Sequence, residues 1–379
     1  MQRLVLNEEQ QMLRESAAGF LKDSGSVSQL RELRDNRDET GFSTRLWQQM
    51  VEMGLAGTLI PEAFGGSEFG HVGMGQISEQ AGRNLTAAPL FASGILGVSA
   101  LLLAGNDDQK TQLEAIATGK LLTALAIDEQ GRHAPNRVST TARPDSDGYV
   151  LDGRKTFVVD GHVADTLIVS ARTAGETDDE AGITLFLVDA KAAGVEIERT
   201  IMVDSHNAAL VQLTGVQVPA TAVLGTLDQG YSVLATLLDI GNAHLAAELL
   251  GVAEEAFEQT MNYIRDRKQF GVTVASFQAL QHRAAHLFSE LELLKSVVLK
   301  ALRCLDDQAD NTAAMVSLAK AKACEIAQLA TNEGVQMHGG VGMTDEYDIG
   351  LFMKRARPLQ QLFGDYAFHA DRYARLNGY

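Results

Sequence analysis

The chain has 379 residues, enough for two or three domains, and 45% of them are hydrophobic, which excludes an intrinsically disordered protein. Its 49 acidic residues outnumber its 32 basic residues, and the net charge of −17 argues against binding to nucleic acid or to an anionic membrane surface. The two cysteines form no CxxC motif and the first residues contain no apolar signal core, so we expect a cytoplasmic protein.

Residues 1–123 are predicted to be mainly helical. The sequence from Asn7 onward is typical of a helix start, and a helical run continues to Leu21. The uncharged segment Leu85–Asn106 contains a proline and three glycines, so we interpret it as a buried helix and expect no membrane span. A short amphipathic helix is predicted at 108–119.

Residues 124–225 are predicted to form antiparallel β structure. Short β-rich runs at 149–151 and 155–159 are each followed by Asp-Gly, at 152–153 and 160–161, a dipeptide that favours turns. Further β-rich runs occur at 166–170, 183–188, 195–197 and 210–213.

Residues 226–379 are predicted to form long helices, because no proline occurs between Pro219 and Pro358. Apolar spacing and alanine content predict three of them, at 245–263, 284–305 and 312–333. The predicted fold class is therefore α+β: an N-terminal α-helical domain, a middle antiparallel β domain and a C-terminal domain similar to a four-helix bundle, with boundaries at 1–123, 124–225 and 226–379.

Generic catalytic motifs do not identify a function. The chain contains no P-loop, no HExxH and no GxSxG, and Gly339–Gly342 follows a predicted helix rather than a strand, which excludes a Rossmann turn. His282 and His286 are one helical turn apart, but no third ligand is near them in the sequence, so no metal site is predicted.

Four longer segments, spread along the whole chain in the expected order, together resemble the acyl-CoA dehydrogenase family. PEAFGG at 61–66 resembles the family's P-x2-[YF]GG turn, and DGRK at 152–155 resembles its NG-x-K hairpin. YIRDRKQFG at 263–271, with SFQALQ at 276–281, is similar to the Y-x3-R-x-QFG…FQ-x2-Q signature. QMHGGVGMTDE at 336–346 is similar to the Q-x-HGG-x-G segment.

The resemblance implies an oxidoreductase of lipid metabolism that uses FAD to convert an acyl-CoA thioester into an enoyl-CoA. A carboxylate would remove the α-proton, the flavin would accept a hydride from the β-carbon, and an electron-transfer flavoprotein would take up the electrons. It also implies an oligomer, as a rule a dimer of dimers.

The resemblance assigns one group of residues to the ADP half of FAD: Arg267, Gln269, Phe270, Gln336, Gly339 and Gly340. It also implies that Phe277 and Met337 bind the cofactor. Arginine supplies a fixed cation for a pyrophosphate, and glycine lets the backbone approach it closely. Another interpretation is that these glycines only cap the preceding helix.

The residues that would hold the flavin ring depart from the family pattern. In place of a TEPGAGSD-like segment the chain has DEQGRHAP at 128–135, in which only Glu129 matches. In place of the W-I-[ST]-N-G segment it has FVVDG at 157–161. Phe157 can stack on the ring, but Val159 has no hydroxyl group for a hydrogen bond to its edge.

The catalytic base is also missing from both of its usual positions, which hold Phe363 and Gly241. Two carboxylates occur near these positions. Asp365 is two residues past the first, and Glu248 is two helical turns past the second in an apolar stretch, where burial would raise its pKa. Each could instead make only a structural contact, Glu248 in an ion pair or interface and Asp365 with backbone or flavin.

These departures are similar to those of the small subunits of two-gene enzymes, such as the pimeloyl-CoA and steroid side-chain dehydrogenases. We therefore predict a base-deficient subunit of a hetero-oligomeric acyl-CoA dehydrogenase. The alternatives are a self-sufficient homotetramer that uses Asp365 or Glu248, another flavin oxidase or monooxygenase of the same fold, and a non-catalytic assembly subunit. The sequence does not predict which acyl group is bound.

Overall fold

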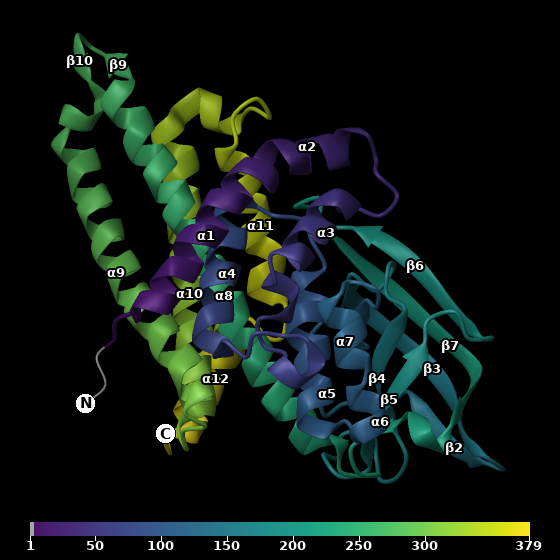
Figure 1. The fold of residues 1–379 in the computed structure, drawn as a ribbon. Coiled ribbons are helices and arrows are strands. Elements are labelled where there is room, and N and C mark those ends of the chain that lie inside the picture. The colour runs from purple at the N-terminus through teal and green to yellow at the C-terminus, as the bar shows by residue number, and fades with distance from the viewer. Residues whose placement is uncertain (1–3) are drawn as a thin grey trace. The chain divides into compact units, whose positions relative to one another are not determined.

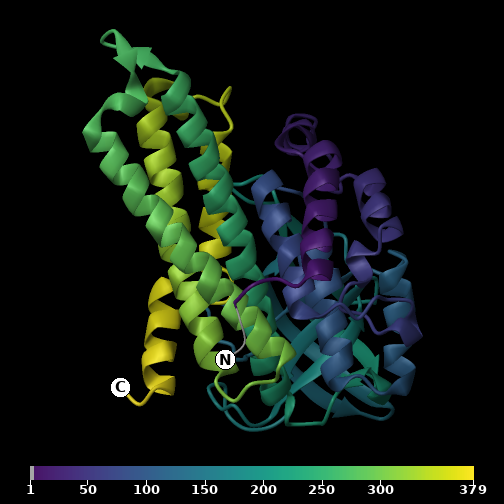
Figure 2. The same cartoon turned by 60° about the vertical axis from the view of Figure 1, so that its left-hand side comes forward.

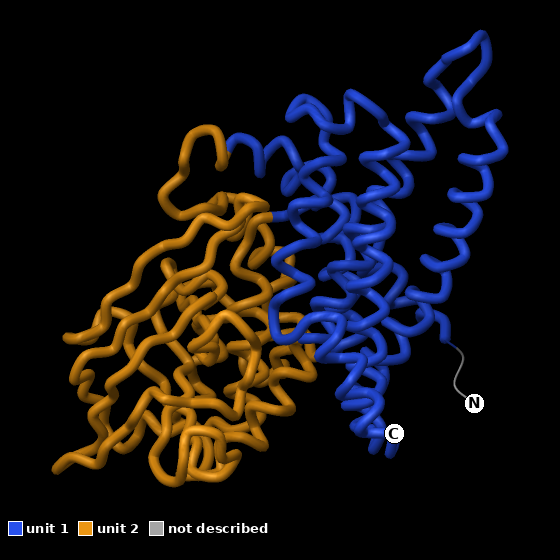
Figure 3. The backbone as a smooth tube through the Cα atoms, turned by 180° about the vertical axis from the view of Figure 1, so that it is seen from behind, with its two compact units in different colours: residues 1–32, 70–86, 242–379 blue, residues 33–69, 87–241 orange. Residues whose placement is uncertain are grey.

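The computed structural model describes residues 4–379 and confirms the predicted fold class (Figure 1). Helices precede and follow a central, mainly antiparallel sheet. The chain forms two compact units, one containing the residues up to Glu32 with 70–86 and 242–379, the other containing 33–69 and 87–241 (Figure 3). These units differ from the three predicted domains, whose boundaries stay a prediction.

The first unit contains two packed helices from the N-terminal region, α1 (Glu8–Ser24) and α4 (Gly70–Asn84). The start of α1 is fixed by a capping box. The Asn7 side chain accepts a hydrogen bond from the backbone N–H of Gln10, and the Gln10 side chain accepts a hydrogen bond from the backbone N–H of Asn7. The predicted helix start is confirmed. Helix α2 (Val27–Asp35) follows α1.

Long helices make up the remainder of this unit, and α8, α9 and α10 run side by side in Figures 1 and 2. Helix α10 packs against α9, α11 and α12. The three predicted long helices are confirmed as α8, α9 and α10. The elements are α8 (Gly230–Asp266), which belongs to this unit from Asn242 onward, β9 (Lys268–Gln269), β10 (Val272–Thr273), the 3-10 helix η5 (Val274–Ser276), α9 (Gln278–Asp306), α10 (Thr312–His338), η6 (Gly339–Met343), α11 (Ile349–Gln361) and α12 (Tyr366–Leu376).

Helix α8 is the one helix among residues 4–379 that is long and apolar enough to cross a membrane. However, 83% of its most apolar stretch is buried within the protein, as is usual for a core helix. The segment predicted as a buried helix from Leu85 to Asn106 forms the π-helix η3 (Leu90–Gly97) and the α-helix α5 (Val98–Ala104), and most of its side chains are buried.

The second unit is built on a sheet with the order β6-β7-β3-β2-β4-β5-β8, in which β1 pairs with β4 in parallel. A core of aliphatic side chains and Phe186 covers the sheet. The strands are β1 (Thr123–Ala126), β2 (Thr141–Asp145), β3 (Gly148–Val159), β4 (Thr166–Arg172), β5 (Ile183–Asp189), β6 (Val195–Ile201), β7 (Asn207–Pro219) and β8 (Val223–Leu224). The short helices are α3 (Thr44–Glu52), η1 (Leu55–Gly57), η2 (Glu62–Phe64), α6 (Asp107–Lys110), α7 (Gln112–Ala117) and η4 (Ala220–Ala222).

The turn predicted at Asp152-Gly153 is wrong. Strand β3 continues through these residues, and its pairing with β7 shifts register between Leu151 and Gly153, which marks a β-bulge. A Cβ atom at Gly153 would lie 2.3 Å from the hydroxyl of Thr140, so glycine is required by close packing and not by a chain reversal. The turn predicted at 160–161 is present, with Asp160 at a φ of 54°.

Candidate functional site

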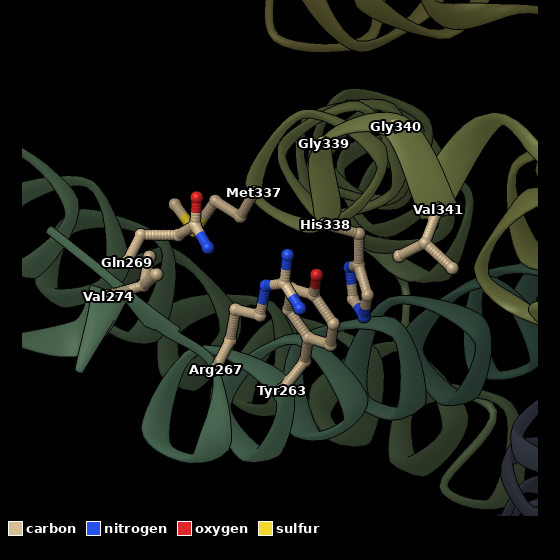
Figure 4. A pocket seen from close by; sticks show the side chains of 9 residues that line it. All are labelled: Tyr263, Arg267, Gln269, Val274, Met337, His338, Gly339, Gly340 and Val341. Carbon is tan, nitrogen blue, oxygen red and sulfur yellow. The ribbon is translucent and has the colours of Figure 1, made fainter. Parts of the chain in front are cut away.

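The first unit contains a pocket of about 490 Å³ at the point where α8 and α10 both end (Figure 4). One wall comes from the end of α8 and the short hairpin that follows it, and the other from the end of α10 and the turn beyond. The lining residues are Tyr263, Arg267, Gln269, Val274, Met337, His338, Gly339, Gly340 and Val341.

The hairpin that forms the first wall turns at Phe270-Gly271. Both residues have positive φ, 56° and 80°, as a two-residue turn with the twist of a β-hairpin requires. The backbone N–H of Val274 donates to the carbonyl of Arg267, which closes the hairpin onto the end of α8. Phe270 is 90% exposed, and its ring meets that of Phe277 edge-on at 6.2 Å.

The second wall depends on glycine at the end of α10. Gly339 has φ 64° and ψ −136°, which side-chain-bearing residues rarely adopt, and its N–H donates to the carbonyl of Gln336. A Cβ atom at Gly339 or Gly340 would meet no atom within 4 Å, so the turn borders open space. The glycines therefore both end the helix and leave room beside it for a ligand.

Arg267 gives this pocket a positive charge. Its guanidinium group has no hydrogen bond or ion pair within the described residues, although the chain as a whole carries a large excess of acids. The other lining residues include no carboxylate. An unpaired arginine among glycine backbone and an amide side chain suits a phosphate-bearing ligand.

The sequence prediction of cofactor-binding residues left out four that line the pocket, Tyr263, Val274, His338 and Val341, and two of these are aromatic. Their rings stack with centroids 4.4 Å apart, and Tyr347 lies on His338 at 4.6 Å. His338 Nδ1 donates to the carbonyl of Gly334 at 2.7 Å, and burial lowers the pKa of the imidazole, which is therefore neutral at pH 7. The available signal was that both residues stand in the family motifs, Tyr263 as the tyrosine of Y-x3-R and His338 as the histidine of Q-x-HGG.

The structure therefore brings together five of the eight residues predicted from these two segments to bind FAD, namely Arg267, Gln269, Met337, Gly339 and Gly340. The other three do not line the pocket. Phe270 and Phe277 lie on and just after the hairpin, and Gln336 is exposed on the last turn of α10. Binding of FAD by any of these residues stays a prediction.

The three residues predicted to lie near the flavin ring belong to the second unit. The carboxylate of Glu129 accepts hydrogen bonds from the backbone N–H of Ser139 and Thr140 and from the fully buried ammonium of Lys155 at 2.7 Å. Burial alone would raise the pKa of Glu129, but the charge and hydrogen bond of Lys155 offset this, and the pKa is lowered. The oxygens of Glu129 are thus engaged within the protein.

Phe157 and Val159 lie at the end of β3, both half-buried. Phe157 has a φ of 53° at a second register shift in the pairing of β3 with β7, between Lys155 and Val158. Positive φ at an aromatic residue is strained and is often retained where a side chain must be aimed.

The two candidate bases both have partners. Oε1 of Glu248 accepts from Nε and Nη2 of Arg355, at 2.8 and 2.5 Å, and both side chains are nearly buried. Asp365 is the N-cap of α12, where its side chain accepts from the backbone N–H of Phe368 at 2.9 Å. Gly241, one of the usual base positions, is a buried residue of α8.

Phe363, at the other usual base position, lies in a turn between α11 and α12 whose carbonyl groups are held by buried side chains. The ammonium of Lys320 donates to the carbonyls of Leu362 and Gly364, at 2.8 and 3.1 Å. The carbonyl of Phe363 accepts from Asn242 at 3.3 Å and lies 3.0 Å from Nε2 of His369.

Phe363 itself is 4% exposed with a φ of 56°. A left-handed phenylalanine persists only where its surroundings enforce the conformation, so the direction of the side chain at 363 is fixed.

The models of one protein family match nearly the whole chain. The acyl-CoA dehydrogenase N-terminal domain matches residues 7–120, the middle domain matches 124–216 and the C-terminal domain matches 228–376.

Individual relatives agree with the family models. The chain is 31% identical to the probable acyl-CoA dehydrogenase YngJ of Bacillus subtilis (strain 168), over 94% of both chains. It is also 31% identical to the caffeyl-CoA reductase-Etf complex subunit CarC of Acetobacterium woodii, over 93% of this chain and 94% of that relative. It matches the crystal structure of the ChsE4-ChsE5 complex from Mycobacterium tuberculosis over 100% of both chains, with a TM-score of 0.89 and 25% identity. The chain therefore belongs to the acyl-CoA dehydrogenase family, whose members are FAD-containing oxidoreductases that act on the CH–CH group of acyl-CoA thioesters.

Proposed function

We propose that this chain is a base-deficient subunit of a cytoplasmic, hetero-oligomeric acyl-CoA dehydrogenase. It contributes a binding site for the ADP half of FAD, and a second dehydrogenase subunit contributes the carboxylate that removes the α-proton. The assembly is a dimer of dimers, and an electron-transfer flavoprotein accepts its electrons.

The observation that carries the proposal is that the usual base positions hold Phe363 and Gly241, and that both nearby carboxylates among the described residues make structural contacts. Glu248 is paired with Arg355, Asp365 caps α12, and residue 363 is a buried phenylalanine. A general base must reach the proton that it removes. In each candidate one carboxylate oxygen is already engaged in a structural contact, Oε1 of Glu248 with Arg355 and Oδ1 of Asp365 with the N–H of Phe368.

The pocket beside Arg267 supports the other half of the proposal, because its residues fit the ADP group of FAD. Arg267 supplies a cation without a partner, and Gly339 and Gly340 border space that a phosphate can occupy. When bound, FAD supplies the acceptor for the hydride that leaves the β-carbon. The residues of this chain bind and orient its nucleotide end, and the proton goes to the partner's carboxylate.

Two further observations support a second subunit. Large apolar side chains lie exposed beside the pocket, Phe270 and Val272 on the hairpin and Met343 at the end of η6. Exposed apolar groups of this size are typical of subunit interfaces. The names of two relatives also describe multi-subunit assemblies, one of them with an Etf protein.

Purification of the chain alone and with a candidate partner tests the proposal. The partner should be a dehydrogenase subunit that has glutamate at one of the usual base positions. We expect the co-expressed proteins to form a stable complex that contains FAD and oxidises an acyl-CoA, while the lone chain does not turn over. Full turnover by the lone chain would support the self-sufficient homotetramer. Oxygen consumption without an electron acceptor would support an oxidase or monooxygenase, and a complex that is active without flavin contacts to this chain would support an assembly subunit.

A further inference from the structure

We propose that Tyr263 is a second phosphate ligand in the Arg267 pocket, and that its hydroxyl group donates a hydrogen bond to the ADP group that Arg267 binds. The inference rests on the proposed binding of FAD and deepens it. It gives a binding role to a residue that the sequence motif contains but to which the sequence analysis assigned no contact, since the predicted ADP site began at Arg267.

The position of Tyr263 supports this role. Tyr263 and Arg267 are four residues apart, so they lie on one face of the last turns of α8, and the N–H of Arg267 donates to the carbonyl of Tyr263. Figure 4 shows the phenolic hydroxyl group and the guanidinium group both pointing into the pocket, toward the end of α10.

The hydroxyl group of Tyr263 is available to a ligand. It makes no hydrogen bond within residues 4–379, although the side chain is half-buried, and the hydroxyl groups of tyrosines in such places usually have a partner. Two neighbouring groups, one neutral donor and one cation, thus face a space without carboxylates. This combination favours an oxyanion over a neutral or cationic ligand.

His338 holds the tyrosine ring in place. The two rings are inclined by 27° with centroids 4.4 Å apart, and His338 is fixed by its hydrogen bond to Gly334 and by contact with Tyr347. Nε2 of His338 is buried without a partner in the described chain, so the imidazole has no second hydrogen bond that would compete with the stack. We therefore assign His338 as a positioning residue, which orients the Tyr263 hydroxyl before the ligand binds.

The ADP group occurs both in FAD and, with an additional phosphate, in coenzyme A. Titrations of the flavin-free protein with FAD, ADP and coenzyme A distinguish the two sources. Each ligand's affinity is measured by calorimetry on the full-length chain in its assembled oligomer.

We expect Tyr263→Phe to weaken FAD and ADP binding about 10-fold or more, the effect of one hydrogen bond to a charged group. A selective loss of coenzyme A binding would also support the tyrosine as an ADP ligand and assign the site to coenzyme A.

Tyr366→Phe is the matched control, because it removes the hydroxyl group of an exposed tyrosine that does not line the pocket. This variant should bind FAD and ADP with affinities within about 2-fold of those of the wild-type protein, since no contact with a charged ligand is lost. His338→Ala should weaken FAD binding in the wild-type background but add little to Tyr263→Phe, since a positioning residue acts through the group that it orients.

The outcomes separate this inference from the proposed function. A wild-type protein that binds neither FAD nor ADP would contradict the function itself. A wild-type protein that binds FAD and ADP, with equal affinities in the Tyr263→Phe variant, would overturn the role of Tyr263 and leave the function standing. Additive effects of His338→Ala and Tyr263→Phe would overturn the assignment of His338 as a positioning residue.

Discussion

Glu248 and Arg355 form a buried ion pair between α8 and α11, in which one carboxylate oxygen receives two hydrogen bonds from the guanidinium group. The two residues are 107 positions apart in the sequence. The pair connects two helices of the C-terminal region, and we expect from it a structural role for Glu248; its role as a base stays a prediction.

Glu248→Gln should therefore lower the free energy of unfolding by about 3–5 kcal/mol, because it leaves the buried Arg355 charge without its counter-charge. The double variant Glu248→Leu/Arg355→Met should recover most of this loss, since both charges are gone. Urea denaturation followed by circular dichroism measures both. A Glu248→Gln variant of native stability that lacks turnover in the assembled enzyme would instead identify Glu248 as the base.

Asp365 provides a second test of a structural role. Asp365→Asn should keep the stability of the protein and the turnover of the complex, because asparagine is an equally good N-cap. Asp365→Ala should cost about 1 kcal/mol of stability, since the N–H of Phe368 loses its acceptor. Loss of turnover in Asp365→Asn, with flavin content unchanged, would contradict this and favour a catalytic carboxylate.

The fold was largely predictable because the strongest local signals agree with it. The long interval without proline between Pro219 and Pro358 contains α8, α9 and α10, and the Asn7 capping sequence begins α1 where expected. The prediction failed at Asp152-Gly153, where the dipeptide resembles a turn. The reason for glycine there is the neighbouring Thr140, a tertiary contact that local sequence does not reveal.

The candidate site was predictable only where its residues form continuous motifs. Arg267 and Gly339 lie in such motifs, and the structure brings them to one pocket. The contribution of His338 depends on its stacking against Tyr263, which comes from a different helix. The pairing of Glu248 with Arg355 likewise depends on the packing of two helices that are distant in the sequence. The sequence alone therefore could not show whether Glu248 forms a structural ion pair or acts as the catalytic base.

Stability should depend on pH through Glu79, a buried residue of α4. Burial and the nearby charge of Glu254 raise its pKa to about 7, although Arg14 lies 2.8 Å away and opposes the shift. Because the folded state binds this proton more tightly than the unfolded chain does, the contribution of Glu79 is fully present below about pH 4.5. It is lost as the pH rises through about 7.

Urea midpoints at pH 5, 6, 7 and 8 measure this dependence. Glu79→Gln should flatten the decline in stability between pH 5 and 8, because glutamine cannot release a proton. The exposed Glu9→Gln is the matched control and should retain the wild-type slope. Parallel curves for the wild-type protein and Glu79→Gln would show that Glu79 is not the titrating group.

The lone chain should not react because residue 363 has no carboxylate, and this is measured by the anaerobic reduction of bound FAD by an acyl-CoA. The acyl-CoA is one that the assembled enzyme oxidises, and the flavin absorbance of the lone chain is followed for the wild-type protein, Phe363→Glu and the control Phe363→Gln. We predict that Phe363→Glu reduces its flavin at least about 100-fold faster than the other two, the low end of the contribution expected from a positioned general base. Equal rates in the wild-type protein and Phe363→Glu, whether fast or undetectable, would contradict the account.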